Sequence, residues 1–78
     1  MKLTFFGRLR DAVGAGEIEC SVPTNIADSE SLRAWIGVEY PALLDPTVRI
    51  ALDDVLISGP APIARVAEAA FLPPVSGG

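Results

Sequence analysis

The spacing of apolar residues changes period twice along this 78-residue chain, and this change limits the folds that the chain can adopt. Apolar and polar residues alternate in residues 2–9 and 17–22, which is typical of half-buried strands. Residues 29–39 instead carry apolar side chains at helical spacing, and residues 48–52 alternate again. A chain of this length forms one domain. The pattern therefore predicts one α+β domain, in which a single main helix packs on one face of a sheet.

The two N-terminal strands and the segment between them predict an antiparallel hairpin. In the first strand we expect Leu3 and Phe5 to face the core, which turns Phe6 outward. Residues 7–16 contain three glycines and mixed charge, so we expect a loop with room for one helical turn. Pro23 ends the second strand, because proline has no backbone N–H to donate to a sheet.

The helix predicted over residues 29–39 has clear start and stop signals. Asp28 is the expected N-cap, and Pro41 cannot continue the helix. Gly37 weakens the helix by about 1 kcal/mol relative to alanine. We expect the apolar stripe to belong to the core, with Trp35 as its largest contributor. The stripe consists of Leu32, Trp35, Ile36 and Tyr40.

A turn and a short strand follow the third predicted strand. The inward side chains of that strand are expected to be Val48, Ile50 and Leu52. The adjacent carboxylates of Asp53 and Asp54 are compatible with metal binding or acid–base chemistry, but short polar side chains are typical of turns, and we interpret them as a turn. Residues 55–57 are expected to return as a short strand.

The segment of residues 63–72 fits two structures. Pro62 followed by several alanines favours a helix with proline at its first position. Alternatively, residues 68–72 form a short last strand in the centre of the sheet, where small side chains permit close packing of the helix above. The residues by themselves leave both structures open.

The composition argues against several classes of function. The net charge is −4 and the chain has no histidine, which argues against nucleic-acid binding and against imidazole-based catalysis or metal sites. Cys20 is the only cysteine, and its apolar neighbours indicate a core position rather than a reactive thiol. No apolar run is long enough to cross a bilayer, and the first residues lack a signal-peptide pattern. We therefore expect a soluble, cytoplasmic protein without a membrane partner.

The chain ends in Pro73-Pro74-Val75-Ser76-Gly77-Gly78. Because the prolines cannot extend a sheet and favour extended backbone, we expect a domain of residues 1–72 and an extended tail of residues 73–78. Six residues span at most about 20 Å, which is enough to enter a cleft in a partner. The paired glycines make the tip thin, so a carboxylate on Gly78 is open on both sides. Chemistry there requires an activating enzyme; the alternative is a frayed terminus with no chemical role.

Several segments along the whole chain resemble the small subunit of molybdopterin synthase, a ubiquitin-like sulfur carrier with the β-grasp fold. These segments are Phe5-Phe6-Gly7-Arg8-Leu9-Arg10-Asp11, Leu32-Arg33, Val48-Arg49-Ile50-Ala51-Leu52-Asp53 and Phe71-Leu72-Pro73-Pro74-Val75-Ser76-Gly77-Gly78. The resemblance implies a mixed sheet with one main helix, and it implies that residues 68–72 are a strand. Two positions differ from the family pattern. Its usual Gly-Asp-Glu turn reads Val66-Ala67-Glu68 here, and its usual asparagine after the third strand is Asp53.

The resemblance also implies a chemical role for the tail. In the family, an adenylating enzyme related to ubiquitin-activating enzymes uses ATP to activate the terminal glycine, and a sulfur donor protein converts it to a thiocarboxylate. The large subunit then transfers the sulfur to cyclic pyranopterin monophosphate during molybdenum cofactor biosynthesis. Carried over to this chain, Gly78 is the reacting residue, and residues 73–77 thread into the partner. The resemblance implies a non-catalytic subunit that binds no cofactor or metal itself and is active only in a two-plus-two assembly with the large subunit.

Strand alternation adds a prediction about docking. Phe5-Phe6 and Phe71-Leu72 are apolar doublets, and one member of each doublet must point away from the helix. If Phe6 and Leu72 do so, and Leu56 joins them, an apolar patch lies beside the start of the tail. These positions align with those that contact the large subunit in relatives. Two other functions stay open: a sulfur carrier for thiamin thiazole synthesis or protein conjugation, and an interaction module whose tail has no chemical role.

Overall fold

The N-terminal hairpin forms as expected in a computed structural model, which describes residues 1–74 of the chain. β1 (Lys2–Phe5) pairs antiparallel with β2 (Glu17–Glu19), and Leu3 lies opposite Ile18. Both strands are shorter than the alternation predicted. Leu3 and Phe5 are buried, which confirms the inward face of the first strand.

A short helix replaces the end of the first predicted strand. α1 (Arg8–Val13) follows Gly7, and Gly14 ends it in a left-handed conformation with φ of 88°. Leu9 is buried on this helix. The strand predicted over residues 2–9 was therefore too long, because Leu9 reaches the core from a helix and not from a strand. The expected single turn within a loop is a six-residue helix.

The main helix begins where its cap predicted. α2 (Ser29–Gly37) starts after Asp28, whose Oδ1 accepts a hydrogen bond from the Ser31 backbone N–H at 2.8 Å. This contact satisfies one of the amides that the first turn of a helix leaves without a partner. The expected N-cap is confirmed, and the helix ends two residues before the predicted end at position 39. Within the stripe, Leu32 and Ile36 are buried, whereas Trp35 and Tyr40 are partly buried around the core.

Gly37 has a packing role at the end of α2. The chain continues into a 3₁₀ helix, η1 (Pro41–Leu44), which packs against α2. A Cβ placed on Gly37 would lie 2.3 Å from Leu44 Cδ2, much closer than carbon atoms approach. The glycine that weakens the helix thus makes room for the segment that follows it.

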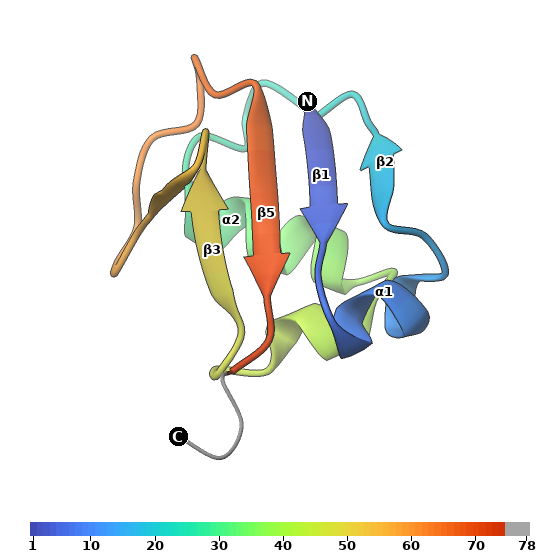
Figure 1. Cartoon of the computed structure of the whole chain (residues 1–78). Coiled ribbons are helices and arrows are strands. Elements are labelled where there is room, and N and C mark those ends of the chain that lie inside the picture. The colour runs from blue at the N-terminus through green and yellow to red at the C-terminus, as the bar shows by residue number, and fades with distance from the viewer. Residues whose placement is uncertain (75–78) are drawn as a thin grey trace.

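The alanine-rich segment of residues 63–72 contributes the central strand of the sheet. β5 (Glu68–Leu72) pairs parallel with β1 on one side and antiparallel with β3 (Arg49–Leu52) on the other. The strand order is β2-β1-β5-β3-β4, so β5 is the central strand (Figure 1). Its Phe71 stacks on Phe5 with ring centroids 5.5 Å apart. The segment is therefore a strand, because hydrogen bonds to two neighbours outweigh the helix propensity of its alanines.

A tight turn joins β3 to the edge strand β4 (Val55–Leu56). Asp53 and Asp54 both have positive φ, of 46° and 70°. Two residues with positive φ match the twist of a two-residue hairpin. The predicted turn is confirmed, and the returning strand has two residues instead of the expected three.

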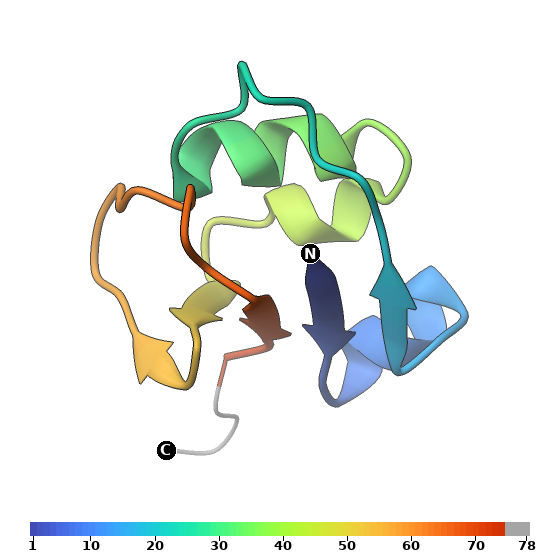
Figure 2. The same cartoon turned by 90° about the horizontal axis from the view of Figure 1, so that it is seen from above.

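The helices and the sheet form two layers. α2 and η1 cover one face of the sheet, and no helix of residues 1–74 covers the other face (Figure 2). The core lies between the layers and consists of Leu3, Phe5, Leu9, Leu32, Ile36, Leu43, Val48, Ile50, Leu52, Ile63, Ala69 and Phe71. The inward residues predicted for the third strand are among them. Within residues 1–74, no helix has the length and apolar character needed to cross a membrane.

Candidate docking face and tail exit

The tail begins at the end of the central strand. β5 ends at Leu72, and Pro73 and Pro74 follow outside the sheet. Because β1 and β5 are parallel neighbours, both strands end at the same edge (Figure 1). Pro73 is partly buried and Pro74 is exposed. The remaining predicted tail residues, Val75, Ser76, Gly77 and the reacting Gly78, lie outside the described residues.

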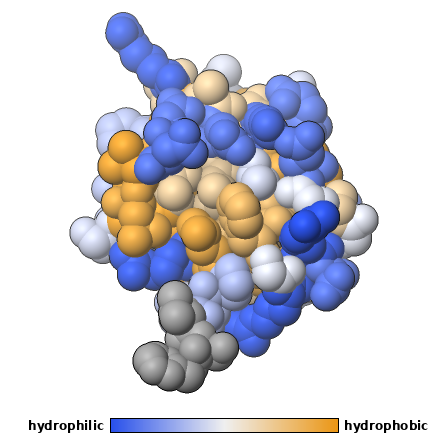
Figure 3. Space-filling view, viewed as in Figure 1, coloured by the Kyte–Doolittle hydropathy of each residue, from blue (hydrophilic) through white to orange (hydrophobic). Residues whose placement is uncertain are grey.

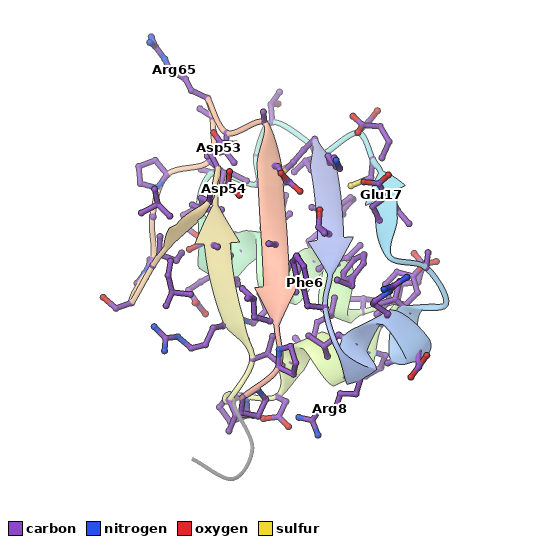
Figure 4. The ribbon with its side chains drawn as sticks, in the orientation of Figure 1. Phe6, Arg8, Glu17, Asp53, Asp54 and Arg65 are labelled. Carbon is purple, nitrogen blue, oxygen red and sulfur yellow. The ribbon has the colours of Figure 1, made fainter. Side chains whose placement is uncertain are left out.

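The three residues predicted for the docking patch lie on the helix-free side of the sheet. Phe6 is 46% exposed, Leu56 is 54% exposed and Leu72 is partly buried. The Phe6 N–H donates a hydrogen bond to the Phe71 carbonyl oxygen at 3.1 Å, which places Phe6 beside Leu72 next to the tail. Figure 4 shows Phe6 between β1 and β5. The outward orientation predicted for Phe6 is confirmed.

Two small residues connect Leu56 to this pair. Leu56 is the pairing partner of Ala51, and Ala51 is the partner of Ala70. Side chains two residues apart on a strand share a face, so Ala70 lies on the same side as Leu72. Figure 3 shows the resulting apolar surface extending across the strands. We call Phe6, Ala51, Leu56, Ala70 and Leu72 the apolar face.

Ala51 and Ala70 were missed in the sequence prediction of this surface. The period of two that identified Phe6 and Leu72 also predicts Ala70 beside them once β5 is known to be a strand. The signal was hidden because the alanines of residues 63–72 also fit a helix. Because these alanine side chains are small, the middle of the apolar face is shallow. The larger side chains, Phe6, Leu56 and Leu72, lie around it.

The opposite end of the same sheet face is polar. Lys2 Nζ lies 2.9 Å from Glu17 Oε2, and Thr4 Oγ1 donates a hydrogen bond to the Glu68 carboxylate. The hydrogen bond and the charge of Glu17 raise the pKa of Lys2 above its ordinary value, so the amine stays protonated. Lys2 and Glu68 are the first residues of β1 and β5, so the parallel pairing places both at the edge away from the tail. Apolar contacts are thereby concentrated where the tail begins.

Positive charge lies near the tail exit. Arg49 of β3 is exposed and is the pairing partner of Leu72. Arg8 lies at the same edge (Figure 4), and its Nη2 is 3.9 Å from Asp45 Oδ2. Both side chains of that pair are largely solvated, so the contact contributes little to stability. The chain is acidic overall, but Arg8 and Arg49 both belong to the edge of the domain at which the tail begins.

Two other candidate sites lack the features of reactive centres. Asp53 uses its carboxylate to accept hydrogen bonds from the backbone of Ala67 and Glu68, as expected of a turn residue. Cys20 is partly buried beside the core, and burial raises the pKa of its thiol, which disfavours the thiolate. In the part of the chain that the structure describes, no three side chains of His, Cys, Asp or Glu gather as a metal site would require.

Known proteins share this architecture and this sequence pattern. The model of the ThiS family matches residues 3–78. The chain is 34% identical over 80 residues to the molybdopterin synthase sulfur carrier subunit of Escherichia coli (strain K12), and the match covers 100% of this chain and 99% of that protein. The crystal structure of SAMP1 from Haloferax volcanii has the same fold, with a TM-score of 0.77 at 20% identity over 100% of this chain and 98% of that chain. The five-stranded mixed sheet with one main helix is thus a β-grasp fold, and the chain is a member of the ThiS family.

Proposed function

We propose that this chain is a sulfur carrier that serves a molybdopterin synthase. The observation that carries the proposal is the 34% identity over its full length to the E. coli sulfur carrier subunit. The geometry supports it in one respect, because the tail begins at the central strand directly beside the apolar face. A carrier needs both elements: a surface that holds the partner and a chain end that enters it.

The proposed chemistry takes place at Gly78. Its carboxylate attacks the α-phosphate of ATP on an adenylating enzyme, forming an acyl-adenylate and releasing pyrophosphate. A sulfur nucleophile at the oxidation level of sulfide, delivered by a donor protein, then displaces AMP and leaves a thiocarboxylate. The sulfur is a better nucleophile than the oxygen it replaces, so the loaded tail is suited to transfer sulfur to cyclic pyranopterin monophosphate. The adenylate supplies the leaving group that the free carboxylate lacks.

The proposed partner surface is the apolar face. We propose that the large subunit of the synthase packs against Phe6, Leu56 and Leu72 while residues 73–78 enter its active site, in a two-plus-two assembly. Exposed apolar surface of this kind usually marks a protein contact. A central apolar cluster with a polar margin is also the common anatomy of interfaces.

Mass spectrometry tests the chemical step. The protein is co-expressed with an adenylating enzyme and a sulfur donor, and its intact mass is measured. We expect a gain equal to the exchange of one oxygen for one sulfur, located on the C-terminal peptide and absent after deletion of Gly78. A chain that never gains sulfur would contradict the carrier role. A chain that gains sulfur but does not restore molybdopterin synthesis with a large subunit would instead serve another pathway, such as thiazole synthesis or protein conjugation.

A further inference from the structure

Gly7 lies against the first residue of the tail. A Cβ placed on Gly7 would stand 2.9 Å from Pro73 Cγ and 3.7 Å from Pro73 Cδ. The first distance is shorter than real Cβ contacts allow. Gly7 also has φ of 54° and ψ of −135°, a region of backbone conformation that is essentially restricted to glycine. Contact and conformation therefore require glycine independently.

The contact continues the parallel register of β1 and β5. Lys2 pairs with Glu68 and Phe5 pairs with Phe71, so the same offset places Gly7 opposite Pro73. The last hydrogen bond of this pairing is donated by the Phe6 N–H to the Phe71 carbonyl oxygen. Proline has no N–H to donate, so beyond that point van der Waals contact takes the place of a hydrogen bond.

We propose that Gly7 is a positioning residue for the reaction at the C-terminus: it seats the ring of Pro73 and so fixes the direction in which the tail leaves the domain. This inference rests on the function proposed above. The ring sets φ of Pro73 near −65°, so the position of the ring determines the path of the chain that follows. A tilt of about 10° at Pro73 would move the end of a fully extended tail, with a reach of ~20 Å, by roughly 3 Å. Misplacement by about 1 Å already costs on the order of 100-fold in rate at an enzyme active site.

The test compares Gly7→Ala with Gly14→Ala. Both glycines have positive φ, but a Cβ on Gly14 has no atom within 4 Å. We expect Gly7→Ala to lower kcat for adenylation by about tenfold or more with a smaller change in KM, since the folded domain can still bind the adenylating enzyme while the tail is misdirected. Gly14→Ala should keep the kcat of the wild type. Denaturant unfolding of each variant corrects for any loss of folded protein.

A double-mutant cycle with Pro73→Ala provides a second test. It compares the effect of Gly7→Ala on kcat in two backgrounds, so it does not rest on the behaviour of the single variant. Pro73→Ala removes the ring atoms that the new Cβ would meet. We expect it to lower kcat by itself, and we expect Gly7→Ala to add less than about twofold in that background, because residues in contact are not additive. Full additivity of the two losses in kcat would overturn the proposed seat.

An NMR experiment on the free protein separates the contact from the function. We expect a nuclear Overhauser effect between the Gly7 α protons and the Pro73 ring protons, and its absence would overturn the contact. A wild-type chain that is not adenylated would overturn the proposed function, and with it the reaction that Gly7 serves. A wild-type chain that is adenylated, together with a Gly7→Ala variant of equal kcat, would overturn the positioning role alone.

Discussion

Asp53 and Glu68 are joined by two hydrogen bonds that run in opposite directions. The Glu68 N–H donates to Asp53 Oδ1 at 2.9 Å, and the Asp53 N–H donates to the Glu68 carbonyl oxygen at 2.9 Å. The same carboxylate also accepts from the Ala67 N–H at 3.1 Å. Both positions at which this chain differs from the usual family pattern thus meet in space. The turn after β3 caps the start of the central strand, although Val66 and Ala67 stand where the family usually has Gly-Asp.

Replacement of Asp53 tests this cap. We expect Asp53→Gly to lower the free energy of unfolding by about 1–2 kcal/mol, because it keeps the positive φ but removes the acceptor for the Ala67 and Glu68 amides. Asp54→Gly is the matched control: φ is also positive there, and within residues 1–74 its side chain makes no hydrogen bond. That variant should be neutral or more stable than the wild type. Urea denaturation measures both, and equal losses would contradict the cap.

The end of α2 provides a test of packing against helix propensity. Alanine is favoured over glycine in a helix by about 1 kcal/mol, but a Cβ at Gly37 would collide with Leu44. We expect Gly37→Ala to destabilise the wild type by about 1 kcal/mol, since overpacking costs about 1–3 kcal/mol. In the background of Leu44→Ala, the same change should be stabilising. Thermal and urea unfolding of the four proteins give the sign of each step, and a gain in both backgrounds would show that Leu44 moves aside freely.

The proposed role of the apolar face can be tested by placing a charge on it and a matched charge on the opposite side of the domain. We expect Phe6→Asp to weaken binding to the large subunit by tenfold or more, about 1.4 kcal/mol, because it places a charge within the apolar face. Val38→Asp is the control, since Val38 is 84% exposed at the end of α2, on the other side of the sheet. Calorimetric titration with the large subunit measures both variants. If the two weaken binding equally, the partner does not use the apolar face.

Asp28 predicts a dependence of stability on pH. The Ser31 backbone N–H donates to the Asp28 carboxylate and holds the pKa of that group below its ordinary value. A lowered pKa in the folded state means that the carboxylate stabilises the fold above the ordinary pKa, near about 4, and that this contribution is lost as the pH falls through the folded value. Asp28→Asn keeps a capping oxygen without the charge. We expect the difference in melting temperature between wild type and variant to shrink below about pH 4, and a constant difference would contradict the assignment.

Much of this fold could be predicted because its signals are local. The alternation of Leu3 and Phe5 identified the buried side of β1, and with it the outward position of Phe6. The start of α2 could be predicted from Asp28, because an N-cap side chain accepts its hydrogen bond from a backbone N–H only three residues further along the chain. The role proposed for the tail also rests on the sequence, through a resemblance to a family whose model matches residues 3–78.

Tertiary structure decided what depends on pairing between distant residues. The alanines of β5 form a strand only because β1 and β3 supply hydrogen bonds on both sides, and no neighbour along the chain provides that information. The same pairing brings Gly7 to Pro73, 66 positions apart in the sequence, and Asp53 to Glu68. The sequence by itself determined which elements could form and how the chain ends. The register of the sheet determined which side chains stand beside the tail, because hydrogen bonds between strands act between residues that only the fold makes adjacent.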